Sequence, residues 1–108
     1  MLNTVILMGH LTADPVLRQT PDNTATMTFT VAVDRPHVKD KEKQADFITC
    51  VAWRGTAEFI SRYFSKGQMI IVEGALRTRT YEDKNDTKHY VTEVQVDNVQ
   101  FGEGKKEG

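Results

Sequence analysis

Apolar and polar residues alternate most regularly between Thr24 and Val33. Threonine occupies every second position at the start of this stretch, and the intervening positions are apolar. Successive side chains of a β-strand point to opposite faces, so the pattern predicts a strand with one buried face and one polar face. The predicted buried face carries Ala25, Met27, Phe29, Val31 and Val33.

Four other stretches also have the patterns of strands. Val5–Met8 is apolar at every position, which predicts burial of both strand faces, one of them against another subunit. Phe47–Arg54 alternates again after a charged stretch. The last two strands are predicted at Met69–Tyr81, with a bend or bulge at Gly74, and at His89–Phe101. The polar stretches Arg35–Ala45 and Glu82–Lys88 are predicted to be loops.

The spacing of apolar residues becomes helical between Thr56 and Lys66, which predicts an α-helix. Gly67 follows at the position expected of a C-cap. One helix in a small protein must bury its apolar stripe, so its large side chains are expected in the core rather than stacked on bases. These side chains are Phe59, Ile60, Tyr63 and Phe64.

The predicted elements follow the order strand, strand, strand, helix, strand, strand. This is the order of an OB-fold, a five-stranded Greek-key barrel with one helix between its third and fourth strands. A chain of 108 residues suffices for one such domain and is too short for two ordinary ones. We expect an all-β OB-fold over residues 1–101 and a short disordered tail over residues 102–108.

Basic and aromatic side chains share one predicted face near the end of the fourth strand. A period of two places Arg77, Arg79 and Tyr81 together, with cations that can meet phosphates and a ring that can meet a base. The alternative is that both arginines are solvated and only protect a strand edge from pairing.

The third strand carries two more candidate rings, Phe47 and Trp53. They fall on the face opposite Ile48, Cys50 and Ala52, a small apolar face suited to the core. This phase favours exposure of both rings in a groove, although an indole is also a common core residue. Cys50 is the only cysteine and lies far in sequence from any histidine, so we expect a buried structural thiol rather than a reactive one.

Composition restricts how such a surface could work. The formal net charge is −1, so attraction of a polyanion would depend on a local basic patch or on oligomerisation. No apolar run approaches the roughly 18 residues of a transmembrane helix, and the first residues lack the features of a secretory signal. We therefore expect a cytoplasmic protein.

Several spaced motifs, in order from about Leu2 to Phe101, resemble those of the bacterial single-stranded DNA-binding proteins and their short phage and plasmid-borne relatives. They are Asn3-Thr4-Val5-Ile6-Leu7-Met8-Gly9-His10-Leu11, Asp14-Pro15 with Arg18, Pro21 at a turn, Gly74-Ala75-Leu76-Arg77-Thr78-Arg79, and Thr92-Glu93-Val94.

The resemblance implies OB-fold domains that assemble as a homotetramer and bind single-stranded DNA without sequence preference, during DNA replication, recombination and repair. It places base-stacking rings at Phe47, Trp53 and Tyr81, and basic residues near the strand at Arg18, Arg77 and Arg79. His37 stands near a position that is often aromatic in the family, and Arg54 follows Trp53 directly. The full set of candidate DNA-binding residues is Arg18, His37, Phe47, Trp53, Arg54, Arg77, Arg79 and Tyr81.

Two other positions depart from the family pattern. Ile48 stands where the family often has a histidine at a tetramer contact, so assembly need not use the same contacts. The last residues, Glu103 to Gly108, do not match the acidic tip that recruits replication and repair proteins in the family. Either this chain does not recruit such partners, or it is a shortened form of a longer protein.

Catalysis finds little support in the sequence. His10, His37 and His89 lack the spacing of metal ligands, and neither a phosphate-binding loop nor a nucleophile elbow is present. We expect no enzyme activity, cofactor or metal. The alternative function from another class is a protein-interaction OB module of a primosome-like assembly that binds nucleic acid weakly.

Overall fold

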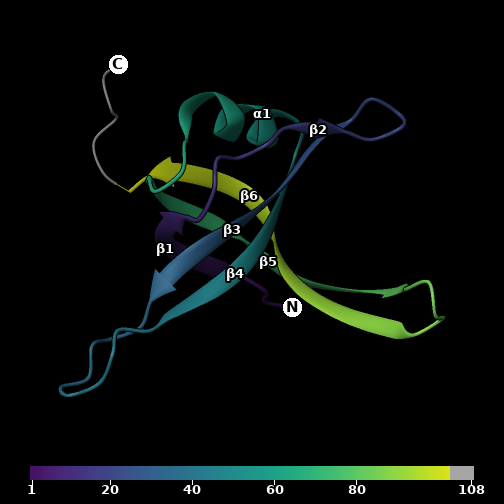
Figure 1. Ribbon diagram of the computed structural model, residues 1–108. Helices are drawn as coiled ribbons and strands as arrows, with labels where there is room; N and C mark the ends of the chain where they lie inside the picture. Colours follow the sequence, from purple (N-terminus) through teal and green to yellow (C-terminus); the bar gives the residue numbers. More distant parts are fainter. Residues whose placement is uncertain (103–108) are drawn as a thin grey trace.

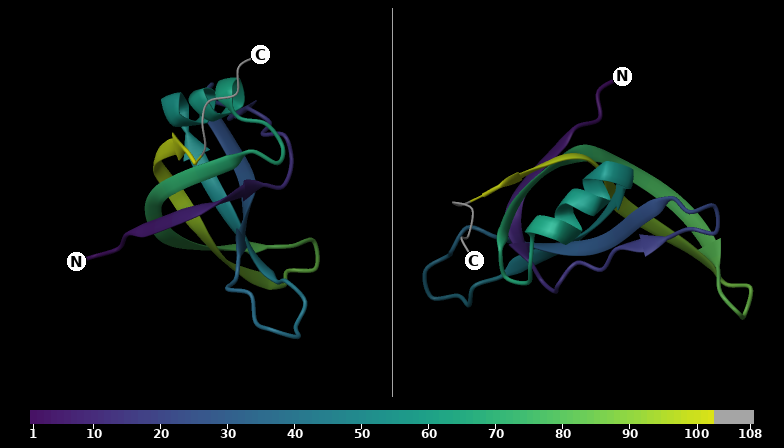
Figure 2. Two further views of the ribbon diagram at one scale, coloured as in Figure 1. Left: turned by 90° about the vertical axis from the view of Figure 1, so that its left-hand side faces the viewer. Right: turned by 90° about the horizontal axis from the view of Figure 1, so that it is seen from above.

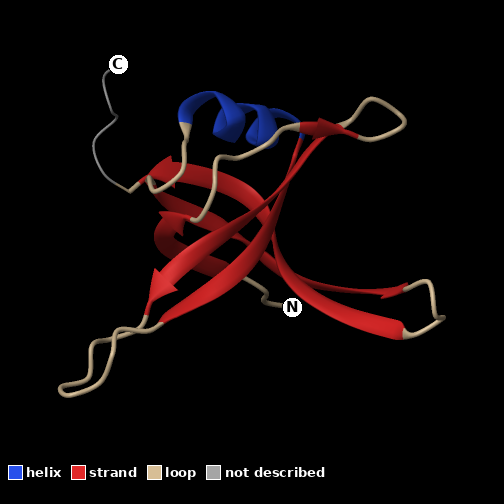
Figure 3. Ribbon diagram, viewed as in Figure 1, coloured by secondary structure: helices blue, strands red, loops and turns tan. Residues whose placement is uncertain are grey.

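The computed structural model describes residues 1–102, so the expected disorder of the tail lies, apart from Gly102, outside the described residues. Strands dominate the described chain, and the single helix follows the fourth of them (Figures 1 and 3). The elements are β1 Val5–Leu11, β2 Arg18–Gln19, β3 Ala25–Asp34, β4 Ala45–Trp53, α1 Arg54–Tyr63, β5 Met69–Glu82 and β6 Lys88–Phe101. Within residues 1–102, no helix is both long and apolar enough to cross a membrane.

The strands close into a barrel. The sheet runs in the order β1-β5-β6-β4-β3-β2, and β1 also pairs with β3 at His10 and Leu11, which returns the sheet to its first strand. β4 and β6 pair in parallel, whereas the other pairs are antiparallel. This is the closed Greek-key arrangement of an OB-fold, so the predicted fold class is confirmed. The short β2 is an addition to the prediction, because two residues carry no detectable period.

Three segments extend away from the barrel. The hairpin of β5 and β6, the β3–β4 loop and the β2–β3 turn all project outward, while α1 lies across one end of the barrel (Figures 1 and 2). The β3–β4 loop is closed at its base by Arg35, whose Nη2 lies 2.7 Å from Oδ1 of Asp46. Both predicted loops are therefore present, and the β5–β6 hairpin forms an exposed arm.

The barrel core confirms the predicted phase of β3. Met27 and Val31 are fully buried, whereas Thr28 on the other face is exposed. Cys50 of β4 is also fully buried, and burial raises the pKa of its thiol to about 12. The thiol therefore stays protonated and unreactive at neutral pH, as expected for a structural cysteine.

Gly74 marks a change of register in β5. The pairing with β6 shifts between Glu73 and Gly74, as expected of a bulge. A Cβ atom at Gly74 would lie only 2.0 Å from the backbone oxygen of Gln95. The two strands therefore approach so closely here that only glycine fits, and the predicted bend is confirmed.

The helix differs from the prediction at both ends. It begins at Arg54 and ends at Tyr63, and Phe64 is already extended, with its N–H still donating to the oxygen of Ile60 at 3.0 Å. Gly67 is therefore not the C-cap. It lies in the following turn at φ 84°, and its N–H donates to the oxygen of Leu11 at 2.8 Å.

The predicted apolar stripe of α1 is only half buried. Ile60 and Phe64 are buried in the core, but Phe59 and Tyr63 are 38% and 40% exposed. The reason is geometric. Only a narrow stripe of the helix surface contacts the end of the barrel, and Phe59 and Tyr63 lie at the side of that stripe. The expectation that both are core residues is wrong.

Within the single chain, β1 covers only one of its two apolar faces. Ile6 and Met8 are 65% and 55% exposed, whereas Val5 and Leu7 are partly buried against the core. One edge of β1 pairs with β5 from Val5 to His10, but its described pairing with β3 is confined to the last two residues. Within one chain, therefore, β1 buries one face and leaves an apolar outer face beside an open edge.

Candidate nucleic-acid interface

β4 presents the predicted row of outward side chains. Cys50 and Ala52 are fully buried, while Phe47 and Trp53 are 70% and 41% exposed. The two rings share a face because they are an even number of strand positions apart. The predicted phase of this strand is confirmed, and neither ring belongs to the core.

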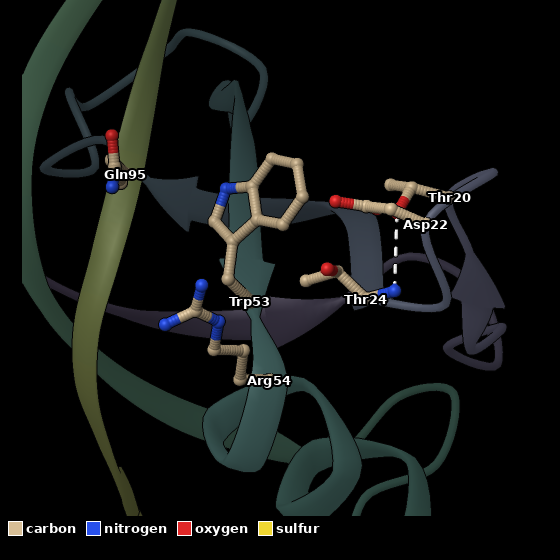
Figure 4. A pocket seen from close by; sticks show the side chains of 6 residues that line it. All are labelled: Thr20, Asp22, Thr24, Trp53, Arg54 and Gln95. Carbon is tan, nitrogen blue, oxygen red and sulfur yellow. Dashed lines mark hydrogen bonds between the residues drawn. The ribbon is translucent and has the colours of Figure 1, made fainter.

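Trp53 lines two hollows of the surface, and Figure 4 shows the residues of the first. The first, of about 500 Å³, is lined by Trp53, Arg54, Gln95 and the turn that contains Asp22. The second, of about 390 Å³, is lined by Trp53 and Gln95 together with β5 residues. We call the two hollows together the Trp53 groove. Its charged lining residues are Asp22, Arg54, Arg77, Arg79 and Glu93.

Arg54 occupies the junction between β4 and α1 with an unusual backbone. Its φ is 54°, a left-handed conformation that costs a non-glycine residue roughly 1–2 kcal/mol. It also places a positive charge at the N-terminus of a helix whose first turn carries no acidic residue. This backbone conformation accompanies a guanidinium that lies in the same hollow as the indole of Trp53 (Figure 4).

The turn opposite Arg54 is held by hydrogen bonds. The Thr20 hydroxyl donates to the carboxylate of Asp22 and accepts from the N–H of Thr24 at 3.1 Å (Figure 4). The bond from Thr20 is the main cause that lowers the pKa of Asp22. The first hollow thus contains one fixed anion, Asp22, and one cation, Arg54.

The second hollow contains an ion pair and an unpaired arginine. Arg79 donates from Nε to Oε1 of Glu93 at 3.0 Å, and Glu93 is only 9% exposed. Oε2 of Glu93 is buried and has no partner among the described residues. Arg77 is exposed and forms no salt bridge within residues 1–102, although Glu93 is its cross-strand neighbour. Arg77 is therefore the cation of this hollow that has no ion pair among the described residues.

Tyr81 continues the same face along the β5–β6 arm. Its ring is 46% exposed, and Cζ of Arg79 lies 5.8 Å from its centroid. The ring of His89 stacks on it at 5.0 Å and 17°, and His89 Nε2 lies 2.8 Å from Oδ2 of Asp83. This contact is the main cause that lowers the pKa of Asp83. Tyr81 is thus positioned by neighbours while nearly half of its surface stays open.

Besides Tyr81, three candidate residues lie outside the Trp53 groove. Arg18 is exposed on β2 and lines a neighbouring hollow that shares Thr28 with the groove. Phe47 is six strand positions from Trp53, or about 20 Å along the strand. His37 is exposed in the β3–β4 loop and lines none of these hollows. The structure therefore gathers Trp53, Arg54, Arg77 and Arg79, with Tyr81 next to them.

Sequence reasoning did not assign Glu93, Gln95 or Asp22 to the site. Glu93 belongs to one of the motifs named above. It could have been assigned to the site only from the strand register, because it pairs directly with Arg77 across β5 and β6. Gln95 reaches the groove through the parallel pairing with Val51. Among residues 1–102, no group of three or more histidine, cysteine, aspartate or glutamate residues is placed to hold a metal ion.

Comparison with known proteins gives a consistent result. Residues 2–102 match the model of the Single-strand binding protein family. The chain is 48% identical to Single-stranded DNA-binding protein A of Bacillus subtilis, over 100% of this chain and 63% of that protein. It is 46% identical to Single-stranded DNA-binding protein 3 of Listeria innocua, over 100% of this chain and 68% of that protein. The chain therefore spans less than two thirds of the B. subtilis protein.

Proposed function

This chain belongs to the single-strand binding protein family, and from that membership we propose that it binds single-stranded DNA without sequence preference and without catalysis. The observation that carries the proposal is the Trp53 groove, in which an exposed indole stands between two hollows lined by three arginines. We also place the protein in the cytoplasm, on single strands exposed during DNA replication, recombination and repair.

The proposed mechanism combines stacking with charge neutralisation. Bases stack on Trp53 and Tyr81, each contact contributing roughly 1–3 kcal/mol, and every base has a flat face that suits such a ring. Phosphates lie against Arg54 and Arg77, which releases counterions. Duplex DNA binds poorly because its bases are already stacked on one another.

The candidates outside the groove extend the proposed path of the strand. Arg18 is next to the groove through Thr28, and Phe47 offers a further exposed ring on the same face of β4. Arg79 contributes as a positioned donor whose charge is offset by Glu93. We also assign a DNA contact to His37, which lies in the β3–β4 loop.

We further propose that the chain assembles as a homotetramer. The apolar outer face of β1, with Ile6 and Met8, and its open edge support strand-to-strand contact between copies. A second apolar surface is the hollow of about 340 Å³ between β1, β4, β5 and β6, which Leu7, Ile48 and Leu76 help to line. Assembly would place several grooves on one particle and increase affinity for a long strand.

The test is a fluorescence titration with oligo-dT and with a duplex of equal length at two salt concentrations, combined with native mass spectrometry. We expect the single strand to quench Trp53, with weaker binding at high salt, little quenching by the duplex, and the mass of a tetramer. An intact oligomer whose fluorescence does not respond to oligo-dT would overturn the proposal and favour a protein-interaction module.

Arg77→Ala should reduce the salt dependence of binding. One phosphate contact on a single strand contributes about 0.7 to the slope of log K against log salt, so we expect the slope to fall by roughly that amount. The measurement is a salt series of oligo-dT titrations. Lys84→Ala at the tip of the arm is the matched control, and an unchanged slope for Arg77→Ala would remove this residue from the site.

Arg54→Gly should raise stability and weaken DNA binding together. Glycine relieves the left-handed backbone and removes a cation from the helix N-terminus, so we expect a gain of about 0.5–1 kcal/mol in the free energy of unfolding. The same change removes a phosphate contact and should lower affinity for oligo-dT. Thermal melting and titration of one preparation measure both effects, and a loss of stability would contradict the strain argument.

A further inference from the structure

The exposed aromatic pair on α1 lies beside a third hollow. Phe59 and Tyr63 have ring centroids 4.9 Å apart. The hollow next to Phe59 has a volume of about 220 Å³ and is bounded by Gly55 on α1 and by Asn98 and Val99 on β6. It is large enough for the edge of a planar ring to enter from the surface.

This hollow continues the Trp53 groove. Along β6, Glu93 and Gln95 line the groove, and Asn98 lines the third hollow, about 10 Å further along the strand. Along α1, Arg54 lines the groove and the next residue, Gly55, lines the third hollow. A Cβ atom at Gly55 would meet nothing within 4 Å, so the surface between them is open.

The helix presents suitable chemistry on this side. Gly55, Phe59 and Arg62 are spaced i, i+4 and i+7, so they fall on one face of α1, and Arg62 is exposed. Phe64 and Phe101 contact the ring of Phe59 at 6.3 and 6.1 Å with interplanar angles of 62° and 60°. These tilted contacts hold the ring in place without covering its exposed surface.

Resting on the function proposed above, we propose that Phe59 is a further base-stacking site and that the DNA strand passes from Trp53 over Gly55 onto it. Arg54 and Arg62 flank this path and neutralise its phosphates. Exposed Glu58 and Asp97 also lie near the path, so it is the continuity of the hollows that favours the same DNA strand over a protein partner as the occupant.

The direct test moves the single indole to the proposed site. In the double variant Trp53→Phe, Phe59→Trp, a ring remains at both positions and only the introduced indole reports fluorescence. Binding of end-labelled oligo-dT is followed by anisotropy in the same titration. We expect quenching of the introduced indole as the strand binds, whereas binding without quenching would overturn the inference.

A second variant keeps the inference testable if the double variant does not fold. Phe59→Leu retains apolar contact with Phe64 and Phe101 but removes the flat ring. With oligo-dT of increasing length, we expect unchanged affinity for short strands that fill only the Trp53 groove. For strands long enough to reach α1, we expect about 5- to 150-fold weaker binding. Phe59→Tyr, which restores a ring, should bind as the wild type does.

The outcomes separate the two proposals. A wild-type protein that shows no quenching of Trp53 by oligo-dT refutes the proposed function itself. A wild-type protein that binds, combined with equal affinity of Phe59→Leu at every length, refutes only the site on α1. An equal loss at every length would also refute it, because it would indicate a structural role for Phe59 or a surface for another partner.

Discussion

Replacing Trp53 by alanine is expected to weaken binding of oligo-dT by about 5- to 150-fold, the equivalent of one lost stacking contact. The effect should be large because the indole lines both hollows of the Trp53 groove, so its removal affects every path of the strand through the groove. The salt slope should change little, since no phosphate contact is removed. Anisotropy of a labelled oligonucleotide measures both quantities.

The matched control for this variant is Trp53→Phe. It preserves a flat ring at the same position, so its affinity should remain within a few-fold of the wild type. Circular dichroism and native mass must show that both variants are folded and assembled. If alanine and phenylalanine at this position gave the same affinity as the wild type, Trp53 would not be a stacking site.

Replacing Gly74 by alanine is expected to destabilise the protein by about 3–5 kcal/mol, in the upper range of single substitutions. The added methyl would lie 2.0 Å from the oxygen of Gln95, a backbone atom that cannot move without disturbing the β5–β6 pairing. A small domain has only about 5–15 kcal/mol of stability in total. We therefore expect a melting temperature lower by more than about 10 °C at equal protein concentration.

Gly55→Ala provides the comparison for Gly74. A Cβ atom at Gly55 meets nothing within 4 Å, and alanine is the better helix former. Its free energy of unfolding should stay equal or rise by up to about 1 kcal/mol. Equal melting temperatures for the two variants would contradict the steric argument at Gly74.

Most of the fold could be predicted from the sequence because burial imposes a period. β3 alternates since one face packs in the barrel, and β4 presents Phe47 and Trp53 outward for the same reason. A limit arises where burial depends on a neighbour. An apolar run such as β1 does not reveal which face is covered within one chain and which by another, so the sequence could not single out Ile6 and Met8 as the exposed side.

The helix shows a different limit. Its start at Arg54 depends on a left-handed backbone conformation, which arginine rarely adopts and which no sequence pattern predicts. Its buried width depends on how far the barrel end opens, which is a tertiary property. The four large residues of its stripe therefore divide into two buried and two exposed ones, Phe59 and Tyr63.

The candidate site was predictable only strand by strand. A period of two aligns Arg77, Arg79 and Tyr81 on β5, and β4 supplies Trp53. The meeting of Trp53 with Arg77 and Arg79 around Gln95 requires the parallel pairing of β4 with β6, whose register is not visible in either strand. The period of two also places Phe47 and Trp53 on one face of β4, but it does not show that they lie near opposite ends of the strand.

Glu93 has a consequence for how long a bound strand would remain. Its carboxylate is held in the wall of the Trp53 groove and opposes the positive potential that the arginines create there. A weaker potential shortens residence time by raising the dissociation rate. For the strand proposed to lie in this groove, the built-in anion thus favours release and rebinding over permanent retention.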